Sequence, residues 1–425
     1  MNALLMVSSP LRRLLAGTLL LGAVACGAFA DVVTDWNVAM TDYATPRSPA
    51  PLPPFSEVRV YAMAHIAMFE AIVQAQYPPW YRHGAASPEA AAAQAAHDVL
   101  VHEFADGAPN FDALLATQLA TIPNGPMKTN GIAIGADAAA DMLAARANDG
   151  AANAEGPYTP GPNPGDYQFT PPFDGPPFNG YAQAVNWGKV TPFVLISGRQ
   201  FRVPPPYKVT DLDYTFDLNE IKALGSAGSL DRTDDETSVA IFWYESSGLG
   251  WNHVARVLAA QRSDSLLNHA RLFAALNAAM TDATIAAFDS KYTYNFWRPI
   301  TAIRMAGTDG NDLTAADPTW EPLLITPPVP DYPSNHANMG GAASVVLAWF
   351  FGGDQQTFSY TSTMSAGFPF VGPRTFHRLS DAAKENATSR MLVGIHFRLA
   401  CETGLKQGRE VGTWVVQHAP YAGGH

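Results

Sequence analysis

The stretch KYTYNFWRP, residues 291–299, is the first of three polar blocks in the last third of the chain. PSNH follows at residues 333–336, and SRMLVGIH follows at residues 389–396. Together the blocks supply three cations (Lys291, Arg298, Arg390), two histidines (His336, His396) and a serine hydroxyl (Ser334). Arginine and lysine donate charge-assisted hydrogen bonds to oxyanions, and the free amides of a helix start add further donors. The blocks therefore predict a buried site for a tetrahedral oxyanion. One histidine would bind its central atom, while the other would move protons.

These spacings resemble the signature of the vanadium-dependent haloperoxidase and type 2 phosphatidic acid phosphatase superfamily. That signature reads K-x6-R-P, then P-S-G-H, then S-R-x5-H-x3-D. The first and third blocks match its spacing, and 33 and 52 residues separate the three blocks. Two positions depart from it: Asn335 replaces the usual glycine, and Ala400 stands where the last aspartate is expected.

Three further stretches look like the bacterial haloperoxidase-like branch of this superfamily. They are YAMAHIAMFEA at residues 61–71, ARANDG at 145–150, and the run from Thr191 through FRVPPP at 201–206. The resemblance therefore covers most of the chain after its first thirty residues.

The resemblance implies an all-α fold, a helical bundle of the vanadium haloperoxidase and acid phosphatase type. It implies that His396 is the axial ligand of vanadate, or the nucleophile that takes a phosphoryl group. His336 would be the general acid and base beside it. Five residues would hold the oxygens: Lys291, Arg298, Ser334, Asn335 through its backbone amide, and Arg390. The three cations among them would also act in catalysis.

The departure at Ala400 concerns the orientation of His396. A ligating histidine is normally oriented by a carboxylate or a carbonyl on its second ring nitrogen. Glu402 is near in sequence, but on a helix it would lie about 120° around the axis from His396. We therefore expect a backbone carbonyl or another acid to orient this ring.

Three functions remain open from the sequence. The first is a haloperoxidase, which would use vanadate, hydrogen peroxide and a halide to halogenate small organic acceptors. The second is a secreted acid phosphatase that transfers a phosphoryl group through His396. The third is a phosphate- or vanadate-binding protein without turnover. Val329 and Phe288 occupy the halide-side positions of the signature and predict an apolar pocket, but they indicate no halide preference.

The N-terminus has the pattern of an export signal. Arg12 and Arg13 precede a twelve-residue apolar run from Leu14 to Ala25, and AFA at residues 28–30 offers a cleavage site before Asp31. The run is short for a membrane span. We expect a periplasmic or secreted protein, while the export route stays open.

Composition narrows the possible partners. The net charge of −12 argues against nucleic acid or an anionic membrane surface. No later stretch is long enough to span a bilayer, so we expect the mature chain to be soluble. After cleavage Cys401 is the only cysteine, which excludes an internal disulfide and a thiolate metal site. The oligomeric state is not indicated.

Hydrophobic periodicity divides the chain into four parts. Residues 1–30 form the signal, residues 31–150 an N-terminal helical part, residues 151–233 an irregular wrap, and residues 234–425 a C-terminal helical part with the oxyanion site. Twelve of the 34 prolines fall in residues 151–206, together with many aromatic residues. Helices are predicted over residues 55–76, 89–104, 127–147, 265–292, 336–351 and 399–416, and another is predicted to be capped by Ser380 and to run toward His396.

Overall fold

The computed structural model describes residues 31–44, 53–77 and 84–422. Over these ranges it contains thirteen α-helices and a single two-stranded sheet, which confirms the predicted all-α bundle. None of the helices in these ranges is both long and apolar enough to cross a membrane. The predicted export signal lies outside the described residues.

The N-terminal helices are α1 (Val32–Ala44), α2 (Pro54–Gln76), α3 (Pro88–Glu103), α4 (Ala108–Ala120) and α5 (Pro126–Arg146). The later helices are α6 (Leu212–Leu224), α7 (Asp234–Phe242), α8 (Ser247–Ala259), α9 (Leu266–Tyr294), α10 (Pro299–Arg304), α11 (Asn335–Phe351), α12 (Leu379–Leu392) and α13 (Arg398–His418). Strand β1 (Phe358–Tyr360) pairs antiparallel with β2 (Arg374–Phe376), with Ser359 opposite Thr375. Short 3-10 helices cover Ala105–Gly107, Ala151–Asn153, Trp187–Lys189, Gly198–Phe201, Ala306–Thr308, Thr363–Ala366 and Pro420–Ala422.

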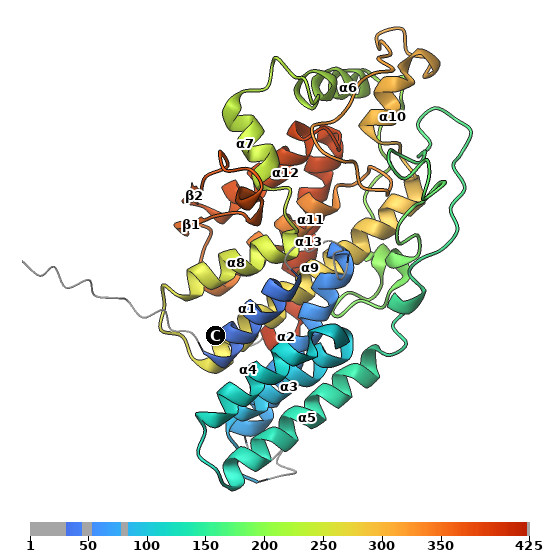
Figure 1. The fold of residues 1–425 in the computed structure, drawn as a ribbon. Coiled ribbons are helices and arrows are strands. Elements are labelled where there is room, and N and C mark those ends of the chain that lie inside the picture. The colour runs from blue at the N-terminus through green and yellow to red at the C-terminus, as the bar shows by residue number, and fades with distance from the viewer. Residues whose placement is uncertain (1–30, 45–52, 78–83, 423–425) are drawn as a thin grey trace, which may run out of the picture.

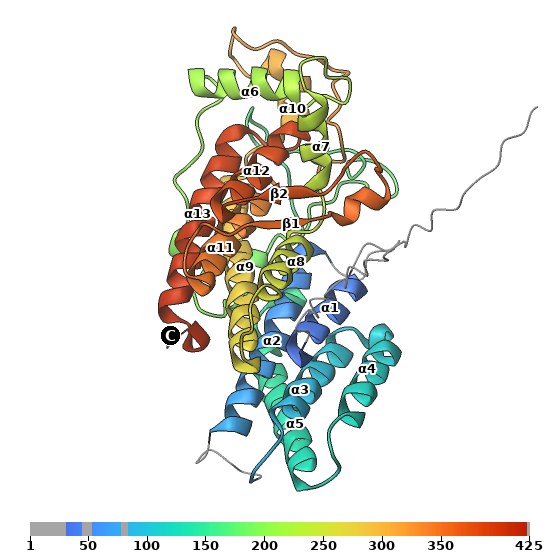
Figure 2. The same ribbon diagram turned by 90° about the vertical axis from the view of Figure 1, so that its left-hand side faces the viewer.

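Helix α9 runs through the middle of the molecule. It packs against α2 on the N-terminal side and against α11 and α13 on the other, as Figures 1 and 2 both show. Ser265 caps its start by accepting a hydrogen bond from the Asn268 amide at 3.2 Å. Asn295 ends it in the left-handed region, with its amide donating to the Lys291 carbonyl at 2.8 Å. The central helix thus stops one turn after Lys291.

Helices α11 and α13 approach each other unusually closely. Gly404, Gly408 and Gly412 repeat every fourth residue of α13, and an added Cβ at each would lie 2.4, 1.8 and 2.8 Å from a backbone oxygen at the start or within α11. Ala400 begins the same row and is fully buried, and its carbonyl accepts the Ser334 amide at 2.8 Å. Because side chains at i and i+4 form one ridge of a helix, this face of α13 tolerates only very small residues.

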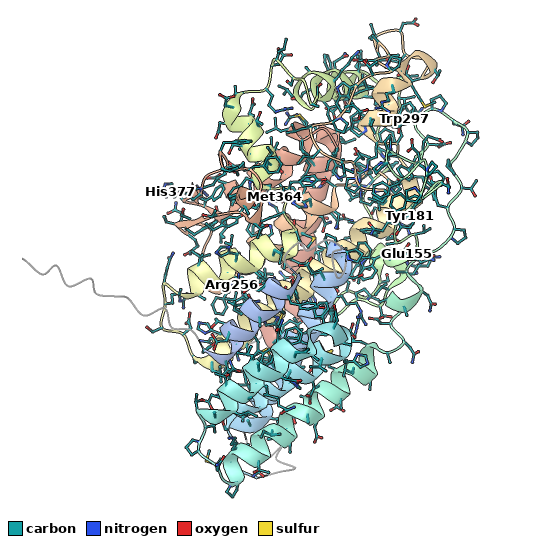
Figure 3. The ribbon with its side chains drawn as sticks, viewed as in Figure 1. Glu155, Tyr181, Arg256, Trp297, Met364 and His377 are labelled. Carbon is teal, nitrogen blue, oxygen red and sulfur yellow. The ribbon has the colours of Figure 1, made fainter. Side chains whose placement is uncertain are left out.

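Residues 151–206 lie against the end of α9 without forming an α-helix. The Tyr167 amide donates to the Asn295 carbonyl at 2.6 Å, and Asp166 makes an isolated bridge with Phe296. Figure 3 shows Glu155 and Tyr181 near one another in this segment, where a carboxylate oxygen of Glu155 also accepts the Ala184 amide at 3.0 Å. The segment is therefore tied to the helical body at several points.

The structure differs from the sequence prediction in several elements. Helix α6 lies within residues 151–233, where no helix was predicted, and α1 and α4 were also not assigned. Arg378, not Ser380, is the N-cap of α12, because the Ser380 hydroxyl instead donates to Asp354 at 2.7 Å. Helix α12 ends at Leu392, so the turn after it, not the helix, carries His396.

One hydrophobic core cluster extends from Val33 in α1 to Ala422 after α13. Both helical parts contribute to it, and α9 contributes residues along most of its length. The division of the chain at residues 150 and 233 therefore stays a prediction.

Prediction on the α11–α13 contact. Gly408→Ala places a methyl group against the Asn338 carbonyl and should lower the free energy of unfolding by about 3 kcal/mol, measured by urea denaturation. Gly228→Ala is the matched control, because nothing lies within 4 Å of its added Cβ. It should change stability by less than about 0.5 kcal/mol. Equal stability of the two variants would show that α13 can shift away from α11 without cost.

Candidate oxyanion site

The three sequence blocks meet where several helices end or begin. Lys291 lies in the last turn of α9, Arg298 is the N-cap residue of α10, and Arg390 lies in the last turn of α12. Ser334 is the N-cap residue of α11, and its Oγ accepts the Ala337 amide at 3.4 Å. The electrostatic surroundings of His396 include Arg298, Lys291, Arg390 and His336. Residues up to 105 positions apart in the sequence are therefore neighbours here.

Residues 329–331, which we call the strap, lie just before the second block and accept hydrogen bonds from side chains of the first block. The Arg298 Nε donates to the Val329 carbonyl at 2.7 Å. The Lys291 Nζ donates to the carbonyls of Pro330 and Asp331 at 2.6 and 3.0 Å. An ammonium has three donors, so one N–H of Lys291 remains for a ligand.

The ring of His396 is held from both sides. Its Nδ1 lies 2.8 Å from the Asp331 Oδ1, and its Nε2 lies 3.0 Å from Nη1 of Arg298. The Arg298 Nη1 also lies 3.3 Å from Nδ1, so the contact with Asp331 decides the tautomer: a carboxylate accepts the Nδ1 proton, which leaves the lone pair on Nε2. The same Arg298 Nη1 donates to the Ile395 carbonyl at 2.6 Å. His396 is therefore a neutral imidazole in the tautomer that a ligand needs.

The site holds an excess of buried positive charge. Lys291, Arg298 and Arg390 are 0, 1 and 4% exposed. The Asp331 carboxylate lies 3.8 Å from Arg298, whereas Lys291 contacts the backbone carbonyl of Asp331. Burial, together with Arg298, lowers the pKa of Lys291 well below its ordinary value, and burial lowers that of Arg390 to about 10. Burial raises the pKa of Asp331 to about 7, although Arg298 and Lys291 oppose the shift. Such a group of cations is stabilised only if an anion joins it.

Several polar atoms at the site have no hydrogen-bond partner among the described residues. They are Arg390 Nε, His336 Nε2, Asn335 Oδ1 and Asp331 Oδ2. Arg390 is otherwise anchored, since its Nη1 donates to the Trp243 carbonyl at 3.1 Å and its guanidinium lies 5.2 Å from the centre of the Tyr244 ring. Buried polar groups are rarely left unpaired, so these atoms indicate a binding site for a ligand with both donors and acceptors.

His336 lies in the first turn of α11 and is partly exposed. Burial, and next Arg390, lower its pKa well below the ordinary histidine value. Without an anion in the site it is therefore a neutral base with a free ring nitrogen. A negatively charged ligand beside it would raise this pKa, because an opposite charge favours the protonated form.

The halide-side positions form a packed apolar wall. Phe288 and Val329 belong to a second core cluster, in which Phe55 lies 5.3 Å from the Phe288 ring and 4.6 Å from the Trp187 ring, measured between centroids. Both residues are nearly buried. Because the Val329 carbonyl accepts a hydrogen bond from Arg298, this apolar wall lies beside Arg298.

Sequence reasoning missed the strap, Trp243 and Tyr244. Backbone carbonyls leave no signal in a sequence, and Trp243 and Tyr244 precede the blocks by almost fifty residues. Asp331 did leave a signal, because it is a lone acid between apolar and proline residues just before the PSNH block. The sequence predicts a backbone carbonyl or another acid as the group that orients His396 without identifying the residue, and Asp331 is that acid.

Comparison with known proteins is consistent with this geometry. Residues 271–422 match the family described as the VCPO second helical-bundle domain. Over 340 residues the chain is 27% identical to the vanadium chloroperoxidase of Curvularia inaequalis, an alignment that covers 61% of this chain and 55% of that protein. The chain thus spans about half the length of this curated relative.

Solved structures of bacterial proteins match nearly the whole chain. A bacterial vanadium-dependent iodoperoxidase is 27% identical, with a TM-score of 0.73 over 91% of this chain and 95% of its own. A bacterial vanadium-dependent chloroperoxidase in its holo form is 17% identical and shows a likeness of fold alone, with a TM-score of 0.72 over 93% and 98%. Together with the family match, these likenesses confirm the resemblance that the three blocks indicated, a similarity to vanadium-dependent haloperoxidases in fold and in the domain that carries the blocks.

Proposed function

We propose that the protein is a vanadium-dependent haloperoxidase-like enzyme that oxidises halide with hydrogen peroxide. One observation carries this proposal: the buried positive charge of Lys291, Arg298 and Arg390 surrounds a histidine whose Nδ1 is bound to Asp331, which leaves the lone pair on Nε2. Cations alone would bind any oxyanion of suitable size. The oriented lone pair adds a bond to the central atom, which vanadate can accept.

The residues fit vanadate on the chemistry of their side chains. Arg298, Arg390 and the remaining N–H of Lys291 can donate to its oxygens, and the α11 start adds amides near Ser334. His396 would bind the central atom of vanadate through Nε2. When bound, vanadate would supply the centre at which hydrogen peroxide is activated for oxygen transfer to a halide.

The chain's own residues would position the reactants and move protons. His336, with its free Nε2, would take a proton when the anion binds and return it to an oxygen during turnover. Lys291, fixed by two strap carbonyls, would polarise an oxygen at a constant place. The wall of Phe288 and Val329 would exclude water on one side.

A phosphatase would use the same cations, with His396 as nucleophile, and a binding protein would use them without turnover. Both alternatives remain as outcomes of the test below. Small organic acceptors are proposed as the final halogen recipients, because the site is too buried for a macromolecular one.

Prediction on activity. With vanadate, hydrogen peroxide and bromide, the purified protein should brominate a phenol indicator, and added phosphate should suppress the reaction by competing for the site. His336→Gln should lower kcat by roughly 10²- to 10⁴-fold, because a positioned proton donor is lost. Lys291→Met should lower it by about 10²-fold or more. Lys406→Met and His377→Gln remove exposed residues of the same types and should leave the rate unchanged.

The same preparation, free of vanadate, is then assayed for hydrolysis of p-nitrophenyl phosphate. Robust hydrolysis without bromination would assign the site to a phosphatase. If neither reaction occurs and the anion still binds tightly, the protein is a binding protein.

Prediction on proton uptake. Because His336 is neutral in the ligand-free site and an anion raises its pKa, sulfate binding near pH 6.5 should take up about one proton. Sulfate does not itself titrate in this range, so isothermal calorimetry in buffers of different ionisation enthalpy measures the uptake directly. His336→Gln should reduce the uptake to what Lys291 and Asp331 contribute, since an anion raises their pKa values too, whereas His396→Gln should retain it. Sulfate affinity should fall as pH rises. Binding without proton uptake in the wild type would remove His336 from its proposed role.

We also propose that the protein is exported, supported by the arginine pair, apolar run and cleavage pattern of residues 12–30. The mass of the protein recovered outside the cytoplasm should correspond to a chain beginning at Asp31. Recovery of the protein only inside the cytoplasm, with residues 1–30 retained, would contradict export.

A further inference from the structure

We propose that Asp331 is the positioning residue for His396, and that it replaces the carboxylate which the superfamily signature places at position 400. The inference rests on the proposed function in one respect, the role of His396 as the vanadate ligand. Asp331 would act through the histidine, without touching the anion.

The contact has the geometry that orientation requires. Asp331 Oδ1 accepts the Nδ1 proton of His396 at 2.8 Å, and the two residues are 0 and 5% exposed. Water therefore has little access to compete for the proton. With Nδ1 bound to the carboxylate, Nε2 keeps its lone pair and faces Arg298. A neutral carbonyl in place of the carboxylate would hold the ring with a weaker hydrogen bond.

The strap fixes the carboxylate in space. The backbone carbonyl of Asp331 accepts from Lys291, and the carbonyl of Val329, two residues earlier, accepts from Arg298. Asp331 also lies 3.8 Å from the Arg298 guanidinium. The segment that carries the Asp331 carboxylate is thus bound to Lys291 and Arg298, two of the cations that would hold the anion. The Nε2 lone pair of His396 is therefore fixed in position relative to these two side chains.

Position 400 cannot supply this carboxylate in the present fold. Ala400 is fully buried in the row of small residues that brings α13 against α11, and its carbonyl already accepts the Ser334 amide. A longer side chain there would push α13 away from the start of α11. The carboxylate therefore comes from the segment before Ser334, on the opposite side of the same contact.

Orientation of His396 matters differently for different anions. Vanadate gains a bond from Nε2, so its affinity depends on how that lone pair is aimed. Sulfate is held by charge and hydrogen bonds alone, so it reports on the cations only. The ratio of the two dissociation constants therefore separates a positioning role from a general structural one.

The experiment compares wild type, Asp331→Asn and Asp331→Ala, with His396→Ala as the reference for a lost ligand bond. Asp217→Asn is the matched control, because Asp217 is a neighbouring acid that accepts the Leu399 amide and the Tyr207 hydroxyl and does not contact His396. Vanadate and sulfate dissociation constants are measured by calorimetry.

Asp331→Ala should weaken vanadate binding about 10- to 100-fold, and Asp331→Asn should weaken it less, because the amide oxygen can still accept the Nδ1 proton. Sulfate binding should stay equal or become tighter, since a negative charge is removed. Asp217→Asn should change neither constant.

Parallel losses of vanadate and sulfate affinity, or no loss of either, would overturn the proposal. A second measurement needs no variant to fold: nitrogen NMR of the ligand-free protein, labelled with ¹⁵N at histidine, should show His396 protonated at Nδ1 only. An Nε2-protonated ring in the wild type would refute the assignment. If wild type binds sulfate but vanadate no more tightly than His396→Ala does, the proposed function fails, while the NMR result still decides the contact with Asp331.

Discussion

Repulsion among Lys291, Arg298 and Arg390 is the constraint on which the site depends. Three cations removed from water cannot be held together by packing alone, and a single carboxylate does not balance them. The chain meets this constraint with backbone oxygens: the carbonyls of Val329, Pro330 and Asp331 each accept from one of the first two cations. The arrangement leaves an unsatisfied positive field, and an oxyanion is the chemical species that satisfies it.

The second constraint is the closeness of α11 and α13. Small residues at every fourth position of α13 let the start of α11 approach, and this approach places Ser334 under the Ala400 carbonyl. Ala400 lies in the same row and is fully buried, with its carbonyl bound to the Ser334 amide. The departure from the superfamily signature at this position therefore falls at a packed contact between the two helices.

Much of the fold could be predicted because long amphipathic helices and their caps leave local signals. Helix α9, with Ser265 before it, and the helix beginning at the PSNH block both appear where periodicity placed them. The convergence of the three blocks could be inferred from their resemblance to a known signature. The strap could not, since backbone acceptors depend on tertiary geometry. Helix α6 was missed because its surroundings are rich in proline, and the cap at Ser380 was wrong because Asp354, distant in sequence, binds that hydroxyl.

The shared core has a consequence for how the protein gains stability. Helices from α1 to α13 bury their apolar faces in one continuous cluster. Helix α9 contributes to this cluster and bears Lys291 in its last turn. A ligand that binds only the native state raises the free energy of unfolding of every element that unfolds together with the site. An anion held at the end of α9 would therefore protect α1, at the far end of the chain, from unfolding as effectively as it protects α13.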